Sequence, residues 1–367
     1  YDLDGNYIGG NVYGDTRSTN DSIALKKSTG EVYWGGGIGS TTVDFDPSAG
    51  EDIITNDKLN SYISICTANN EYVDTFLFNQ NQISFGDGPT VTDIKFDSMS
   101  NLFLVGEFDG LLDFDLSAET NNYQSLGGYD AFVSKWNPDN SYAWTRRFGG
   151  EYSDRAYALN IDSYGNVYIG GEFRAVNLDF DFAQDGFDVH SSSLQGNPGA
   201  FMTILRNNGD YVKTYSWGTT YEVDGYIGVK RIISDSVGRV YAYGWYYGDA
   251  DFDPSDSVYI LKSGNVSFGY HESAFVSTFY PYISTTPTDP VGVFGVPGYT
   301  YSNDSTLSSL STSEGSLSPL FTSTNLNYSN VVNSTIGGVS ITPVSSNSGA
   351  KISINGYKVY SNTASDL

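Results

Sequence analysis

Paired acidic side chains recur along this 367-residue chain in four copies of the tripeptide Asp-Phe-Asp. The steps between successive copies are 69, 66 and 72 residues. Alternate side chains of a strand point to the same side, so the two carboxylates of a copy share one side and the Phe takes the other. Because Ca²⁺ binds about six to eight oxygen atoms and favours carboxylates, the pairs predict calcium binding. The candidate ligands are Asp44, Asp46, Asp113, Asp115, Asp179, Asp181, Asp251 and Asp253.

A structural role for the same acids is the alternative. Asp side chains also accept hydrogen bonds in turns, and the Phe between them is then a core residue. A second calcium candidate, the segment Asp2-Leu-Asp-Gly-Asn6, is similar to part of a calcium loop but lacks the third acidic position and the distal Glu.

Catalytic motifs are missing from the sequence. The histidines, His190 and His271, lie in different repeats, and neither belongs to a known motif. No nucleophile elbow, zinc-protease motif or phosphate loop occurs. Acid pairs also serve in glycosidases, but a pair that returns with every repeat is better explained by the repeat. We therefore expect a protein that is not an enzyme.

The elements that hold these acids repeat with them. Upstream of each tripeptide comes a turn followed by a strand, in residues 27–35, 97–106, 162–170 and 235–244. Downstream comes another strand, at 62–65, 131–134, 200–203 and 274–277, and then a polar turn such as 137–140 or 207–210. The strands are short, β-branched and aromatic, with Gly30, Gly165 and Gly238 in the upstream turns. We expect an all-β fold with about four strands per unit.

Residues 1–283 resemble the β-propeller repeats of bacterial secreted proteins, the SBBP type. The resemblance is carried by the segment 162–173 (DSYGNVYIGGEF), by the Asp-Phe-Asp element and by the strand that begins at Asp130. It implies a propeller of four repeats of about 70 residues each. Because residues 1–8 match the turn and strand at 137–142, the chain begins in mid-repeat. Either the N-terminal strand completes the last blade and closes a ring of four, or the repeats belong to a larger propeller.

Residues 284–300 are rich in Pro and Gly and are predicted to form a linker. Beyond it, residues 301–367 are rich in Ser, Thr and Asn, with strands expected near 307–313, 328–332, 338–344 and 350–354. This part resembles the bacterial cadherin-like β-sandwich domain through Leu317-Ser-Pro319, Phe321, Tyr328 and Ile352-Ser-Ile-Asn-Gly356. The family continues with two more strands, so we expect an incomplete sandwich with an exposed edge, unless the remaining strands are absent from this sequence. A strand from a neighbouring subunit would fill such an edge by β-augmentation.

The charge of the chain excludes several partners. It has 43 acidic and 18 basic residues, for a formal net charge of −25. Such a field repels nucleic acid and anionic membranes, and no apolar run reaches membrane-spanning length. The single Cys66 cannot form an internal disulfide and is expected to be a small core residue.

These observations favour an extracellular structural or adhesive protein at the cell surface. We expect it to be a subunit or segment of a larger assembly, with copies of itself or other surface-protein chains as partners, joined by strand complementation. One alternative is a glycan-binding module that uses exposed Tyr and Trp. A third reading is a polysaccharide-active enzyme.

Overall fold

The computed structural model describes residues within 22–279 and 307–366. The gaps in the first range are 39–40, 47, 49, 51, 57–59, 79, 83–87, 116, 118, 176, 183–186, 193–196, 220–224, 237, 254–258 and 264–272. The gaps in the second range are 314–316, 319, 324–328, 331–339, 347–351, 355–356 and 360–364. The mid-repeat segment 1–8, the calcium-loop candidate at Asp2–Asn6, His271 and the linker 284–300 therefore lie outside the described residues.

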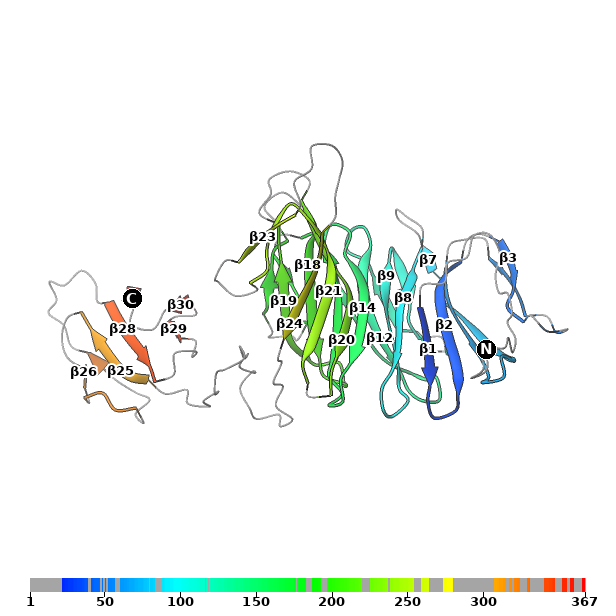
Figure 1. Ribbon diagram of the computed structural model, residues 1–367, viewed down its shortest axis with the longest axis horizontal. Coiled ribbons are helices and arrows are strands. Elements are labelled where there is room, and N and C mark those ends of the chain that lie inside the picture. Colours follow the sequence, from blue (N-terminus) through cyan, green and yellow to red (C-terminus); the bar gives the residue numbers. More distant parts are fainter. Residues whose placement is uncertain are drawn as a thin grey trace. The chain divides into compact units, whose positions relative to one another are not determined.

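All regular structure in the described residues is β-strand, which confirms the predicted fold class (Figure 1). The chain divides into two compact units, Tyr1–Phe294 and Gly295–Leu367. In the described part of both units, no helix is long and apolar enough to cross a membrane.

Among the described residues of the first unit, the larger antiparallel sheets are four in number and follow the positions of the predicted repeats. The first sheet contains β1 (Ser22–Lys26), β2 (Glu31–Ile38), β5 (Asn60–Cys66) and β6 (Tyr72–Phe78), in that order. The second contains β8 (Thr90–Phe96), β9 (Leu102–Phe108), β12 (Asp130–Trp136) and β13 (Tyr142–Phe148). The third contains β14 (Arg155–Ile161), β15 (Val167–Phe173), β18 (Gly199–Leu205) and β19 (Tyr211–Trp217). The fourth has three described strands, β20 (Tyr226–Ser234), β21 (Val240–Tyr247) and β24 (Ser273–Phe279).

An additional hairpin stands between the second and third strands of every sheet. The hairpins are formed by β3 (Thr41–Asp44) with β4 (Ile53–Asn56), β10 (Leu111–Asp113) with β11 (Asn122–Gln124), β16 (Leu178–Asp179) with β17 (Val189–His190), and β22 (Asp249–Asp251) with β23 (Ile260–Lys262). A short strand, β7 (Gln80–Gln82), also pairs with β10. The prediction of about four strands per repeat therefore describes the main sheet of each repeat and omits this hairpin.

The turns between the first two strands have the backbone that the sequence predicts. Gly30, Gly165 and Gly238 have φ angles of 79°, 84° and 83°. The second repeat has Ser100 at this place, with a φ of 66°. Because left-handed backbone strains a residue with a Cβ, the glycines fit the turn with less strain than the serine.

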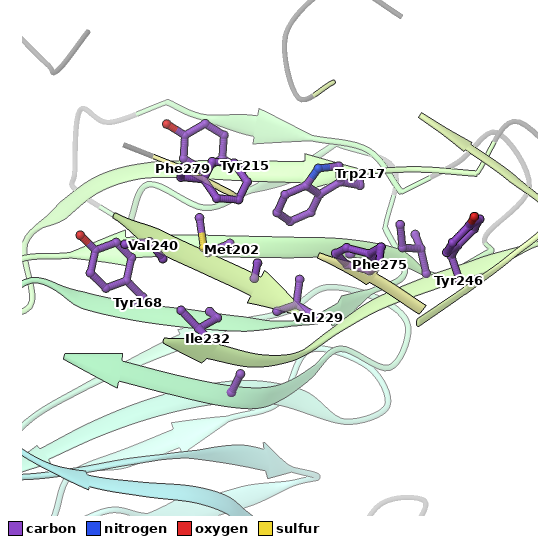
Figure 2. Packing of buried hydrophobic residues seen from close by; sticks show 14 of the residues in the cluster. Tyr168, Met202, Tyr215, Trp217, Val229, Ile232, Val240, Tyr246, Phe275 and Phe279 are labelled. Carbon is purple, nitrogen blue, oxygen red and sulfur yellow. The ribbon is translucent and has the colours of Figure 1, made fainter. Parts of the chain in front are cut away.

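Successive sheets pack face to face, as Figures 1 and 2 show. The first strands of the sheets contact one another in chain order: β1 with β8, β8 with β14, and β14 with β20. The core between the third and fourth sheets is aromatic and aliphatic, and Figure 2 labels its larger members. They are Tyr168, Met202, Tyr215, Trp217, Val229, Ile232, Val240, Tyr246, Phe275 and Phe279. Cys66 is buried in the first sheet, as predicted, and burial raises the pKa of its thiol.

The middle sheets are buried on both faces, whereas the fourth is not. All seven residues of β18 are buried. In the corresponding strand β24, Phe275 and Phe279 are buried but Ala274, Val276 and Thr278 are exposed. One face of the fourth sheet therefore packs on the third sheet, and the other is open to solvent.

The second unit holds smaller sheets. One contains β25 (Leu307–Thr312), β28 (Ser340–Ser345) and β31 (Ser365–Asp366), and the others pair β26 (Leu317–Ser318) with β27 (Ser329–Asn330) and β29 (Ile352–Ile354) with β30 (Tyr357–Val359). Strands β25, β27, β28 and β29 correspond to the four that the sequence predicts for this unit.

Candidate functional sites

Each Asp-Phe-Asp tripeptide begins at the last residue of the first hairpin strand: Asp44 in β3, Asp113 in β10, Asp179 in β16 and Asp251 in β22. The structure thus places one acid pair on each repeat and does not merge the pairs into one site. The central Phe is fully buried in three copies, Phe45, Phe114 and Phe180, and half-buried in the fourth, Phe252. The predicted burial of the Phe is confirmed for three of the four copies.

The first Asp of every pair holds its hairpin closed. In the second repeat, Asp113 Oδ1 accepts hydrogen bonds from the amides of Asp115 (3.0 Å) and Asn121 (2.8 Å). The same two bonds recur at the other three copies, on the Oδ1 atoms of Asp44, Asp179 and Asp251. The second Asp extends the network as well, since Asp46 and Asp115 accept from the amides of Ser48 (2.9 Å) and Ser117 (3.0 Å).

These contacts bear on the calcium hypothesis. One oxygen of each first carboxylate is engaged by two backbone amides, which leaves the other oxygen for a cation. Among the described residues, no group of three or more Asp, Glu, His or Cys side chains is arranged to hold a metal. Since calcium takes about six to eight oxygens, a pair would need backbone carbonyls and water to complete the shell. The described geometry favours turn formation as the main role of the pairs, and calcium binding stays a prediction.

A partly buried ionic cluster between the second and third sheets was not predicted from the sequence. The Arg155 guanidinium lies 2.7 Å from Glu107 and 3.1 Å from Glu172. Burial raises the pKa of Glu107 to about 7, although Arg155 opposes the shift. The signal in the sequence is the repeated Gly-Glu-Phe at 106–108 and 171–173. The corresponding positions of the other repeats are Gly37 and Trp245, so the charges belong to the middle of the row.

Two more buried acids lie in the same region. Asp130 is fully buried and forms an ion pair with Arg147, and burial raises the pKa of Asp130 to about 6. Asp154 accepts from the amides of Gly150 (2.9 Å) and Arg174 (2.8 Å), and burial raises its pKa to about 7. The Asp154 bonds connect the segment after β13 of the second sheet with the end of β15 in the third, whereas Asp130 and Arg147 lie on neighbouring strands of one sheet. Both arrangements indicate a structural role.

One histidine forms contacts that the sequence did not indicate. His190 Nδ1 lies 2.7 Å from the Ser216 hydroxyl, and His190 Nε2 lies 3.2 Å from Asp188 Oδ1. The residue types are those of a serine hydrolase. However, the Asp188 carboxylate also accepts bonds from the Tyr211 hydroxyl and the Thr214 amide, which attach the hairpin to β19. In the first sheet, Tyr72 donates to Asp52 in the same way, so this arrangement is explained by the repeat.

Exposed aromatic residues lie at several separate places. Tyr152, Tyr164, Phe187, Tyr243 and Tyr259 are between 46% and 82% exposed. They come from different loops, turns and strands of the described residues. The glycan-binding alternative therefore receives no specific support from them.

Comparison with known proteins gives a match for the C-terminal part of the sequence. Residues 307–367 match the model of a family described as the cadherin-like β-sandwich domain. This match confirms the resemblance seen in the sequence, and it favours an extracellular or cell-surface location. A search of curated proteins gives no match. The likeness of residues 1–283 to propeller repeats stays a prediction, and the structure contributes the repeated four-stranded sheets that it requires.

Proposed function

We propose that this protein is an extracellular structural or adhesive component of the cell surface, working as a subunit or segment of a larger assembly. Its four sheets act as blades of a propeller, and neighbouring chains are joined by strand complementation. The proposal assigns no catalytic role. Support for the location comes from the cadherin-like match at 307–367 and from the net charge of −25, which disfavours nucleic acid and anionic membranes as partners.

The observation that carries the proposal is the edge of the fourth sheet. In the first three sheets, the third strand pairs with a fourth strand: β5 with β6, β12 with β13 and β18 with β19. Among the described residues, β24 pairs only with β21. An open strand edge presents unpaired N–H and C=O groups that accept another strand.

The cadherin-like unit offers a second edge of the same kind. In its described part, β25 pairs with β28 on one side only. The Asp-Phe-Asp hairpins add a further element to the proposal, namely weak calcium binding through the carboxylate oxygens that the backbone amides leave available. Calcium would then stiffen the loops without building the fold.

Electron microscopy of the purified protein tests the proposal, with a competing peptide as the specific probe. The peptide carries the sequence of β19, YVKTYSW, which is the fourth strand of the third sheet. We expect ordered fibres or rings without peptide, and shorter or dispersed particles with an excess of it. A scrambled peptide of the same composition is the control. Dispersed particles at every protein concentration would contradict the proposed assembly.

A further inference from the structure

The open face of the fourth sheet carries exposed apolar and aromatic side chains, with Arg231 beside them. We define this outer face by Ile233 on β20, Tyr241 and Tyr243 on β21, and Val276 and Thr278 on β24. The cross-strand pairs Tyr243–Val276 and Tyr241–Thr278 place these residues on one face, and Ile233 pairs with Tyr241. Ile233 is 63%, Tyr243 46% and Val276 66% exposed.

The same positions are covered in the other three sheets. Val276 corresponds to Ile63, Val133 and Met202, each of which pairs with the equivalent residue of the second strand. All three are 0% exposed because the next sheet packs on them. The outer face of the fourth sheet is therefore an inter-sheet surface on which no described sheet packs.

The complementary surface is open on the first sheet. Ile23 of β1 corresponds to Ile94, Leu159 and Ile232, the residues that each later sheet packs against the sheet before it. These three are at most 4% exposed, whereas Ile23 is 69% exposed. Leu25, two residues further along β1 on the same face, is 52% exposed.

The existing interfaces show how these two surfaces would meet. A Cβ added to Gly35 would lie 3.1 Å from Ile94 Cδ1, and one added to Gly170 would lie 2.8 Å from Ile232 Cδ1. The residue equivalent to Gly35 and Gly170 in the fourth sheet is Tyr243. In the existing interfaces, Gly35 and Gly170 leave space for the isoleucine of the next sheet. At the equivalent position of the fourth sheet, the ring of Tyr243 would instead provide a surface on which Ile23 packs. Its neighbour Arg231 directs its guanidinium to the Lys230 carbonyl at 2.8 Å and the Tyr157 carbonyl at 3.5 Å, back toward the third sheet.

We propose that the outer face of the fourth sheet binds the first sheet of a second copy of this chain, with Ile23 of one copy packed against Tyr243 and Val276 of the other. Within one chain, Ile23 and Val276 are both about two-thirds exposed, so they do not cover each other. The contact joins different surfaces of the two copies. Such a heterologous interface repeats from copy to copy and gives rings or filaments.

This inference rests on the proposed function and names the partner surface. It differs from strand complementation in its chemistry, because side chains on a sheet face make the contact instead of backbone groups on a sheet edge. The two modes can therefore be separated by experiment: a peptide strand competes with the edge, whereas a charge placed on the face disrupts only the stacking.

Disulfide trapping tests the proposal directly. Ile23→Cys and Tyr243→Cys are prepared as separate full-length proteins, mixed, and oxidised under mild conditions. We expect a cross-linked dimer on non-reducing gels from the mixture and not from either protein alone. Wild-type protein is the control for Cys66, which is buried. Val73→Cys, at a position 44% exposed on β6, replaces Ile23→Cys as a matched control and should not cross-link.

A third protein with both cysteines in one chain decides between copies and self-closure. A fast internal disulfide in that protein, without cross-linking in the mixture, would overturn the proposal and show that the first and fourth sheets of one chain meet. Absence of any specific cross-link would overturn it as well. The proposed strand complementation would survive either result if the protein still assembles in a peptide-sensitive way.

Val276→Asp provides an independent measurement. Because this side chain is exposed, the variant should fold with an unchanged circular dichroism spectrum, and sedimentation should show self-association weakened by about tenfold or more. Val73→Asp is the matched control, with association unchanged. Equal association of Val276→Asp and wild type would contradict the inference, even if peptide competition supports the proposed function.

Discussion

The third and fourth sheets have the same strand order and nearly the same register, yet they experience different surroundings. Met202 and Val276 occupy equivalent positions, and their exposed fractions are 0% and 66%. Gly170 and Tyr243 form a second equivalent pair, as do Glu172 and Trp245. Equivalent positions therefore share the same backbone path, whereas the presence or absence of a neighbouring sheet determines whether the side chain at each position is buried or exposed.

The largest expected difference in stability comes from placing an aspartate at the equivalent positions Met202 and Val276. Met202→Asp would bury a carboxylate among the residues shown in Figure 2 and should destabilise the first unit by more than about 4 kcal/mol. Val276→Asp should change stability by about 0.5 kcal/mol or less, because its side chain stays in water. Chemical denaturation followed by tryptophan fluorescence measures both. Similar losses in the two variants would mean that the outer face of the fourth sheet is covered in the monomer.

A second contrast concerns volume at the glycine position. In Gly170→Val, the new Cβ would lie 2.5 Å from Val229 Cγ1, so the two sheets must separate, at a cost of about 1–3 kcal/mol or more. Tyr243→Val at the equivalent position should be close to neutral for the monomer. Thermal unfolding compares the two, and a tolerated Gly170→Val would show that the interface between the third and fourth sheets is loose.

The pH dependence should reflect the buried acids of the middle sheets. Glu107, Asp130 and Asp154 have pKa values raised by burial to about 7, 6 and 7. The folded state therefore binds more protons than the unfolded state between about pH 4 and 7, and the free energy of unfolding falls as pH rises through that window. We expect a higher Tm at pH 5 than at pH 8. Asp154→Asn should reduce this difference, and an unchanged pH profile would show that Asp154 is not the group that titrates.

The hairpins should respond to loss of the first Asp more than the second. Asp113→Ala removes the acceptor of two backbone hydrogen bonds and should cost about 1–2 kcal/mol. Asp115→Ala removes the acceptor for Ser117 alone and should cost less. Thermal unfolding of both variants measures the difference. A reversed order would assign the main structural role to the second Asp.

Calcium should have the smallest effect. With one carboxylate oxygen engaged by amides and no described group of three metal-binding side chains, we expect millimolar Ca²⁺ to raise the Tm by only a degree or two relative to EDTA, roughly as expected for weak binding. Asp46→Asn and Asp115→Asn together should remove that shift, and Mg²⁺ is the control. A large calcium-dependent increase would instead show a well-formed site.

Short-range patterns made part of this structure predictable. The Asp-Phe-Asp period located the repeats, and the turn glycines located hairpins because a positive φ is a local requirement. The ion pairs of Arg155 with Glu107 and the contact of His190 with Ser216 could not be predicted in this way. They depend on how one sheet faces the next and how a hairpin folds onto β19, which strand alternation does not specify. The open face of the fourth sheet was missed for the same reason, since its sequence resembles that of a covered sheet.

The size of one side chain at each inter-sheet contact has a consequence for folding. Gly35 of the first sheet leaves space for Val91 of the second, and Gly170 of the third sheet leaves space for Val229 of the fourth. In the second sheet the equivalent residue is Val105, and the third sheet packs the smaller Ala156 near it. At these three described contacts a large residue faces a small one, but the sheet that contributes the large residue changes from one contact to the next. If the second sheet docked on the fourth in place of the third, Val105 would meet Val229 and the two would collide. In proteins built from similar repeats, out-of-order pairing is a common route to misfolding. This alternation of side-chain volume therefore favours packing of each sheet on its correct neighbour.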